Sequence, residues 1–63
     1  MLKKLAEIRK KKGLNQAVIA EACGVAQSAV AMWENGAATP RVDRLIKIAE
    51  ILGCSVDELL SDE

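Results

Sequence analysis

Residues 16–35 read QAVIAEACGVAQSAVAMWEN, and their spacing predicts two short helices on either side of a glycine turn. Ala20 is small, as required where two helices that cross at a steep angle approach closely. Gly24 follows four residues later, where the chain must leave the first helix, and glycine reaches a positive φ without steric penalty. Val30 lies six residues further on and can fill the space beneath the crossing. Such a triplet also occurs by chance in any two packed helices. The flanking sequence must therefore show whether this particular pair of helices is formed.

The composition is that of one small folded domain, spanning residues 1–63. Hydrophobic residues make up 51% of the chain, which argues for a folded globule over a disordered tail. The apolar set is aliphatic and rich in alanine, which favours helix. No apolar run approaches the ~20 residues of a membrane span, and the basic N-terminal residues lack the apolar segment of a signal peptide. We therefore expect a cytoplasmic, bacterial or phage-like protein with no membrane contact.

Glycines divide the chain into five expected helices, because each glycine follows a helix-like stretch and suits a left-handed C-terminal position. The expected helices cover residues 2–12, 16–23, 27–35, 41–52 and 56–61, approximately. Asn15 is a favourable N-cap for the second helix, and Ser55 with Glu58 three residues later has the spacing of a capping box. The sequence therefore predicts an all-α fold, a compact five-helix bundle.

The expected core is an inner apolar stripe on each helix. Its members are Leu2, Leu5, Ile8, Ile19, Ala20, Cys23, Val30, Trp33, Val42, Leu45, Ile48, Ala49, Leu52, Leu59 and Leu60. Cys23 and Cys54 belong to no CxxC pair, and the chain has no His, so we expect free thiols and neither a metal nor a cofactor. The same lack of His, together with the lack of a phosphate-binding loop, argues against an enzyme.

The formal net charge is zero, but charge is unevenly distributed along the sequence. Residues 1–12 carry six cations against Glu7 alone, whereas residues 55–63 carry four carboxylates and no cation. One interpretation is two solvated ends of opposite charge. The other is a basic edge that faces phosphates and an acidic edge that is turned away from them. Charge alone does not separate the two.

Two short helices joined by a turn containing glycine form the helix-turn-helix pattern, which places its second helix in the DNA major groove. Over nearly its whole length the chain resembles the Cro and phage-repressor type of helix-turn-helix domain, the lambda-repressor-like fold. The resemblance rests on residues 13–16, 19–20, 24–25, 30, 33–36, 40, 45, 48–49, 52–53 and 55–60. It implies a sequence-specific DNA-binding regulator, expected to be a repressor that binds a palindromic operator as a weak dimer.

The resemblance also implies roles for individual residues. Base contacts are expected from Gln27, Ser28 and Met32, since a Gln amide can bond adenine bidentately and a Met can pack on a thymine methyl. Phosphate contacts are expected from Asn15, Gln16, Asn35 and Arg41. Arg9 and Glu34 match an ion pair that orients the third helix, and Val56 with Glu58 matches a dimer contact.

The chain departs from the family pattern at two places. Ala26 stands where a capping Ser or Thr is usual, and residues 37–39 lack the usual lysines and arginines. These departures leave few expected phosphate contacts and keep open an alternative function in which the same fold binds a partner protein, an interpretation that the zero net charge and the alanine-rich third helix favour. In that alternative, Met32, Ile46, Ile51 and the fifth helix form the contact surface.

Overall fold

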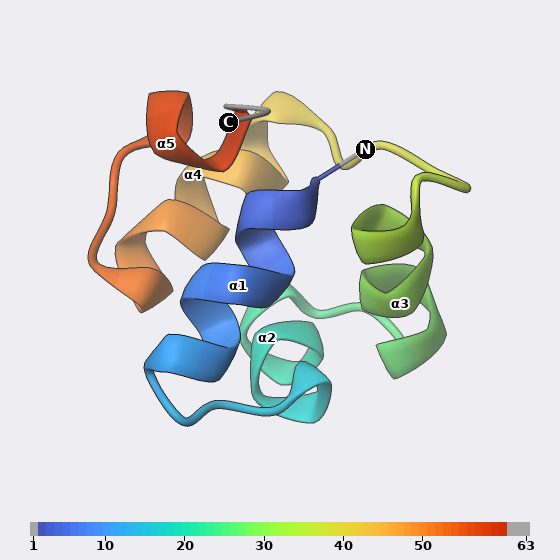
Figure 1. Cartoon of the computed structure of the whole chain (residues 1–63). Helices are drawn as coiled ribbons and strands as arrows, with labels where there is room; N and C mark the ends of the chain where they lie inside the picture. The colour runs from blue at the N-terminus through green and yellow to red at the C-terminus, as the bar shows by residue number, and fades with distance from the viewer. Residues whose placement is uncertain (1, 61–63) are drawn as a thin grey trace.

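The computed structural model describes residues 2–60, apart from the side chain of Lys3. Five helices account for most of this part of the chain: α1 (Lys3–Lys11), α2 (Gln16–Cys23), α3 (Gln27–Asn35), α4 (Val42–Leu52) and α5 (Val56–Leu60). Each expected helix is present: α2 and α3 have the expected bounds, α1 is one residue shorter at each end, and α4 begins one residue later. Residue 61, the expected end of the fifth helix, lies outside the described residues. In Figure 1, α3 lies on one side of the molecule and α5 on the opposite side, with α1 between them. The expected all-α fold is confirmed.

The turn between α2 and α3 has the geometry expected from its glycine. Gly24 ends α2 at φ 71° and ψ 34°, in the left-handed region that favours glycine. The backbone N–H of Gly24 donates to the Glu21 carbonyl oxygen at 3.2 Å, and that of Val25 donates to the Ala20 carbonyl oxygen at 3.0 Å. These bonds satisfy two carbonyls that a helix end would otherwise leave without partners. The turn therefore closes α2 and sends the chain directly into α3.

Side-chain caps fix the starts of two helices. The Asn15 side-chain oxygen accepts a hydrogen bond from the Val18 N–H at 3.0 Å. Ser55 Oγ accepts from the Glu58 N–H at 3.1 Å, while the Ser55 N–H donates to Glu58 Oε1 at 3.2 Å. Both partners of the predicted capping box are thus engaged. By contrast, Ala26 at the N-cap of α3 offers no side-chain acceptor.

The core lies where all five helices meet, and most of the expected inner residues form it. Leu5, Ile19, Val30, Ile48 and Leu59 are fully shielded from solvent. The rest of this core consists of Leu2, Ala20, Cys23, Trp33, Leu45, Ala49 and Leu52. Trp33 is 6% exposed, so it packs in the core and is unavailable for stacking on a base. Ile8 is half-buried at the edge of this core.

Three apolar residues lie differently from the sequence prediction. Val42 was expected inside but is 70% exposed, at the first residue of α4. Leu60 was expected beside Leu59 but is 50% exposed. Val56 takes its place against the core, since positions three apart on a helix share a face and Val56 precedes Leu59 by three. The inner face of α5 is therefore formed by Val56 and Leu59.

The bare N-cap of α3 leads to a stability prediction. Ala26 has the extended backbone of an N-cap, with φ −72° and ψ 151°, and its side chain is exposed. We predict that Ala26→Ser raises the free energy of unfolding by about 1 kcal/mol, because the hydroxyl can accept from an unpaired N–H of the first turn. Urea denaturation measures the change. Ala22→Ser, at an exposed position inside α2, is the matched control and should give no gain; equal gains would contradict the capping mechanism.

Candidate nucleic-acid interface

One face of α3 carries the side chains expected to contact bases. Gln27 and Ser28 are exposed in its first turn, and Met32, one turn beyond Ser28, is 42% exposed. Val30 and Trp33 occupy the opposite face and are buried. This division leaves α3 with a short polar and thioether surface that faces solvent, formed by Gln27, Ser28 and Met32. The geometry suits a helix that enters a groove with its N-terminal residues first.

A charged cluster joins α3 to α1 and α2. Arg9 of α1 donates from Nε to Glu34 Oε2 at 2.7 Å and from Nη2 to Glu34 Oε1 at 3.1 Å, a bidentate pair. Gln16 of α2 donates from Nε2 to the same Glu34 Oε1 at 3.0 Å. The side chains of Arg9 and Glu34 are only 10% and 9% exposed. Because a guanidinium and a carboxylate match in a planar fork, this cluster fixes orientation as well as distance.

Arg9 also stabilises the end of its own helix. Its Nη1 donates to the Leu14 carbonyl oxygen at 3.0 Å, just before α2 begins. The Leu14 N–H in turn donates to the Arg9 carbonyl oxygen at 3.1 Å. One guanidinium therefore links the end of α1, the entry to α2 and, through Glu34, the C-terminal half of α3. Sequence reasoning gave the Arg9–Glu34 pair only through the family resemblance and missed the bonds to Leu14 and Gln16.

The environment of Glu34 lowers the pKa of its carboxyl group. Burial by itself raises that pKa, since a carboxylate loses solvation in the interior. Hydrogen bonds from Arg9 and Gln16, together with the positive charges of Arg9 and Lys10, outweigh burial and leave the pKa below its ordinary value. Glu34 is therefore ionised at neutral pH and accepts all three hydrogen bonds as a carboxylate.

The residues expected to contact phosphates lie at helix ends and in loops. Asn15 and Gln16 begin α2, where backbone N–H groups and the helix dipole attract an anion. The Asn35 side-chain oxygen accepts from the Ala37 N–H at 2.9 Å, which leaves its amide nitrogen as the donor that a phosphate requires. Arg41 is exposed immediately before α4. Of these four residues, Gln16 is bonded to α3, through Glu34.

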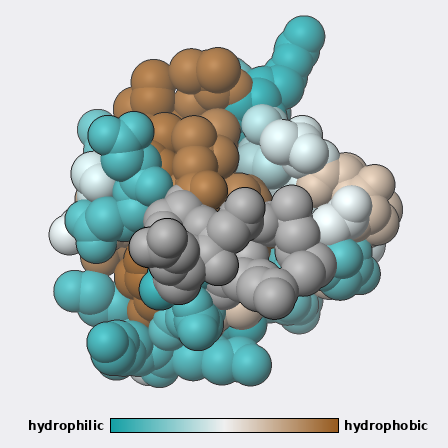
Figure 2. Space-filling view, turned by 45° about the horizontal axis from the view of Figure 1, so that its top comes forward, coloured by the Kyte–Doolittle hydropathy of each residue, from teal (hydrophilic) through white to brown (hydrophobic). Residues whose placement is uncertain are grey.

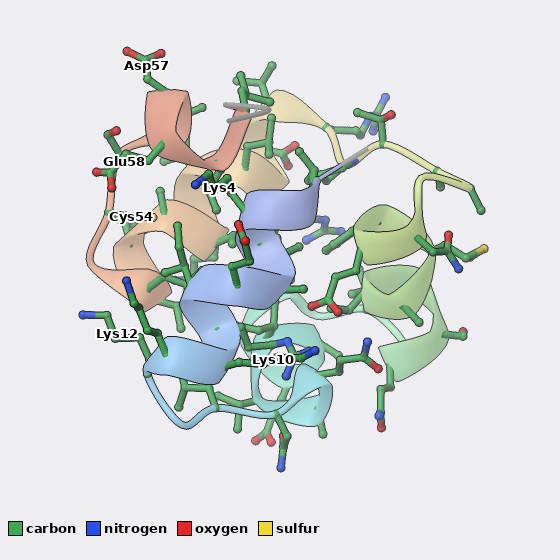
Figure 3. All side chains as sticks on the ribbon, viewed as in Figure 1. Lys4, Lys10, Lys12, Cys54, Asp57 and Glu58 are labelled. Carbon is green, nitrogen blue, oxygen red and sulfur yellow. The ribbon has the colours of Figure 1, made fainter. Side chains whose placement is uncertain are left out.

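The basic and acidic ends of the sequence are neighbours in the fold. α1 packs against α5, and Lys4, Lys11 and Glu58 line one shallow groove whose floor is Ile8. Figure 3 shows Lys4 of α1 beside Glu58 of α5. The interpretation of a basic edge with the acidic edge turned away is therefore wrong for these residues. Asp62 and Glu63 lie outside the described residues.

α4 packs against α2 and contacts its C-terminal end. Arg44 donates from Nη1 to the carbonyl oxygen of Cys23, the last residue of α2. Burial raises the pKa of the Cys23 thiol, opposed by the charges of Arg44 and Lys47. Cys23 and Cys54 are both free thiols, and Cys54 is half-buried.

Residues 2–60 contain neither a metal-binding cluster of side chains nor a membrane-spanning helix. Within this range, no group of three or more His, Cys, Asp or Glu side chains is placed to hold a metal ion. No helix among these residues combines the length and apolar character needed to cross a membrane.

Comparison with known proteins identifies the family. A family model described as Helix-turn-helix matches residues 5–59. The chain is 37% identical over 60 residues to the HTH-type transcriptional activator BcrR of Enterococcus faecalis, covering 95% of this chain and 29% of that protein. It is 30% identical over 59 residues to the cryptic phage CTXphi transcriptional repressor RstR of Vibrio cholerae, covering 94% of this chain and 53% of the repressor.

A solved structure agrees with these matches. The crystal structure of a transcriptional regulator from Listeria innocua superposes with a TM-score of 0.84 at 33% identity, covering 92% of this chain and 54% of that one. The protein therefore belongs to the Cro and phage-repressor type of helix-turn-helix family, a family of DNA-binding transcription regulators rather than enzymes. The chain spans about a third to a half of the length of the relatives it matches.

The lowered pKa of Glu34 predicts a loss of stability in acid. The folded state binds the Glu34 proton less tightly than the unfolded state, so the contribution of the carboxylate is fully present above the ordinary glutamate pKa of about 4.3. That contribution is lost as the pH falls through the lower pKa of the folded state. We predict that the free energy of unfolding of the parent falls more steeply below about pH 4 than that of Glu34→Gln, which has no carboxyl group to protonate.

Urea denaturation at a series of pH values, with both proteins in the same buffers, measures the two slopes. Glu7→Gln is the matched control, because Glu7 is exposed and pairs with Lys4 at 3.7 Å on the surface of α1. It should keep the parent's steep slope. Parallel curves for the parent and Glu34→Gln would contradict the role assigned to the carboxylate.

Proposed function

We propose that this domain is a sequence-specific transcriptional repressor that binds a palindromic operator as a symmetric dimer. The observation that carries the proposal is the exposed face of α3, which presents Gln27, Ser28 and Met32, on a helix that the Arg9–Glu34–Gln16 cluster ties to α1 and α2. Polar side chains in the first turn of a recognition helix read base edges in the major groove. The domain would act on DNA in the cytoplasm, at the nucleoid.

The cluster supports this proposal through the position of Gln16. One hydrogen of the Gln16 amide is used by Glu34, and an amide nitrogen carries a second. That second hydrogen, at the N-terminus of α2, can be donated to a phosphate while α3 lies in the groove. A single cluster would then set both the phosphate contact and the orientation of the reading helix.

The small number of Lys and Arg side chains near the interface supports the proposal of a dimer. Residues 37–39 carry no cation, and Lys4 and Lys11 of α1 lie beside Glu58 of α5. One domain would therefore make few phosphate contacts, and a second copy on the other half of a palindrome doubles them. The contact expected at Val56 and Glu58 stays a prediction, although Val56 packs against the core and Glu58 is engaged in the capping box.

In the alternative function, a protein-binding module, one of the expected contact residues is not available at the surface. Ile46 and Met32 are exposed as it requires, at 50% and 42%. Ile51 is packed against the core instead. Met32 also shares a helix face with Ser28, which fits a groove-facing role equally well.

Truncation of Gln27 and truncation of Gln16 should change DNA binding in different ways. Gln27→Ala should cost about 1–3 kcal/mol at one base pair and relax the sequence preference there, because it removes a base contact. Gln16→Ala should weaken all sequences alike, because it removes a phosphate contact. Selection of binding sites from random DNA, followed by titration of selected and unrelated duplexes, measures both effects. If Gln27→Ala selects the parent's full site, the assignment of the base contact is wrong.

A further inference from the structure

The start of α3 lies far from the charged cluster that orients this helix. The cluster of Arg9 and Gln16 bonds α3 at Glu34, the residue before its last. Gln27 lies seven residues earlier, about 10 Å along the helix, and Ala26 provides no side-chain cap there. A tilt of about 10° around Glu34 would move Gln27 by roughly 2 Å, enough to break a hydrogen bond to a base edge.

A contact from α4 fixes the turn that leads into α3. Arg44 is half-buried and donates from Nη1 to the carbonyl oxygen of Cys23, the last residue of α2. A helix leaves its last four carbonyl oxygens without partners inside the helix, and Arg44 satisfies one of them. In the described part of the chain, this is the one side-chain hydrogen bond that reaches residues 19–33. It lies four residues before Gln27, the first residue of α3.

The charge of Arg44 also suits this position. The C-terminal end of a helix carries partial negative charge, and α2 has no basic residue in its own last turn, so Arg44 supplies a cation from another helix. Burial raises the pKa of the Cys23 thiol, while the charges of Arg44 and Lys47 lower it, which places both cations near the end of α2. Of the two, Arg44 alone hydrogen-bonds Cys23, and Lys47 is exposed.

Arg44 connects the turn to the start of α4. Arg41, an expected phosphate contact, precedes α4 directly, and Arg44 follows it by three residues, about 4.5 Å along a helix. The inner face of α4 is buried in the core, whereas Val42 and Ile46 are apolar and exposed. Figure 2, in which the α5 end of the molecule is brought forward, shows apolar surface gathered in one area there. Apolar contacts do not fix direction, so the hydrogen bond of Arg44 supplies the directional contact between α4 and the turn.

We propose that Arg44 is a positioning residue for DNA recognition. By bonding the last carbonyl of α2, it holds the α2–α3 turn in a fixed place relative to the start of α4. The ion-pair cluster fixes the C-terminal end of α3 and Arg44 fixes its N-terminal end, so the base-reading side chains keep their distance from the phosphate contact at Arg41. The inference rests on the proposed function, because it takes α3 and Arg41 to contact DNA.

Arg44→Met tests this role, because methionine is long and apolar and has no N–H to donate. We expect its affinity for the selected operator to fall roughly tenfold, because base contacts lose alignment, while its affinity for unrelated DNA stays within about twofold. Lys47→Met is the matched control, since it removes a cation of α4 near the same helix end but no hydrogen bond to Cys23. It should keep the parent's ratio of the two affinities. Arg44→Lys, whose ammonium can donate to the same carbonyl, should recover most of the loss.

A direct phosphate contact by Arg44 would give a different result. Arg44→Met would then weaken binding to all sequences alike and reduce the slope of log affinity against log salt concentration by about one, and this outcome would overturn the positioning role. Both duplexes are titrated with the same protein sample at several salt concentrations, so any unfolded fraction cancels in the ratio of affinities. If Arg44→Met does not fold, Arg44→Gln, with a shorter side chain, takes its place and should lower the ratio in the same direction.

Amide hydrogen exchange without DNA tests the turn itself. The N–H groups of Gly24 and Val25 are bonded within the turn and should exchange faster in Arg44→Met, whereas the N–H of Leu59, bonded in α5, should exchange as in the parent. Unchanged exchange at the turn would count against the inference.

The parent protein separates this inference from the proposed function. If the parent selects no site from random DNA, the proposed function fails and the positioning role fails with it. If the parent selects a site and folded Arg44→Met keeps the parent's ratio of affinities, only the positioning role fails.

Discussion

The bidentate ion pair between Arg9 and Glu34 is the constraint on which the interface depends. It joins α1 to α3 across 25 positions of sequence, and Gln16 brings α2 into the same cluster. The pair is nearly excluded from solvent, so its Coulombic gain is offset by the desolvation of two charges. Its main effect is therefore geometric. It sets how α3 is rotated, and the rotation determines whether Gln27 and Ser28 face outward.

The hydrophobic core and the Arg9–Glu34–Gln16 cluster stabilise α3 in different ways. Val30 and Trp33 are buried on one face of α3. Their burial provides most of the hydrophobic stabilisation that holds α3 against the core. Apolar contacts are non-directional, however, and would tolerate some rotation of the helix about its axis. A hydrogen-bonded fork fixes direction. The recognition face thus depends on both, with stability from the apolar side and orientation from the polar side.

Local signals in the sequence were enough to predict the helices, whereas their mutual arrangement was less accessible. Gly24 and the Ser55–Glu58 box act within a few residues, so their geometry followed from spacing alone. Which flank of a helix is covered depends on distant elements, and for that reason the exposure of Val42 and Leu60 was predicted wrongly. The hydrogen bond from Gln16 to Glu34 spans 18 positions and has no signal in the spacing, because it depends on the angle between α2 and α3.

The most direct test replaces the ion pair by apolar residues of similar size. In Arg9→Met combined with Glu34→Leu, no buried charge remains, so folding should be retained within about 1–2 kcal/mol in urea denaturation. Lys4→Met with Glu7→Leu removes a surface ion pair of α1 and serves as the matched control. The measurement is the affinity of each folded variant for the selected operator relative to unrelated DNA. The ion-pair account predicts that the Arg9/Glu34 variant loses most of this preference while the control keeps it. A folded Arg9/Glu34 variant that retains the parent's preference would contradict it.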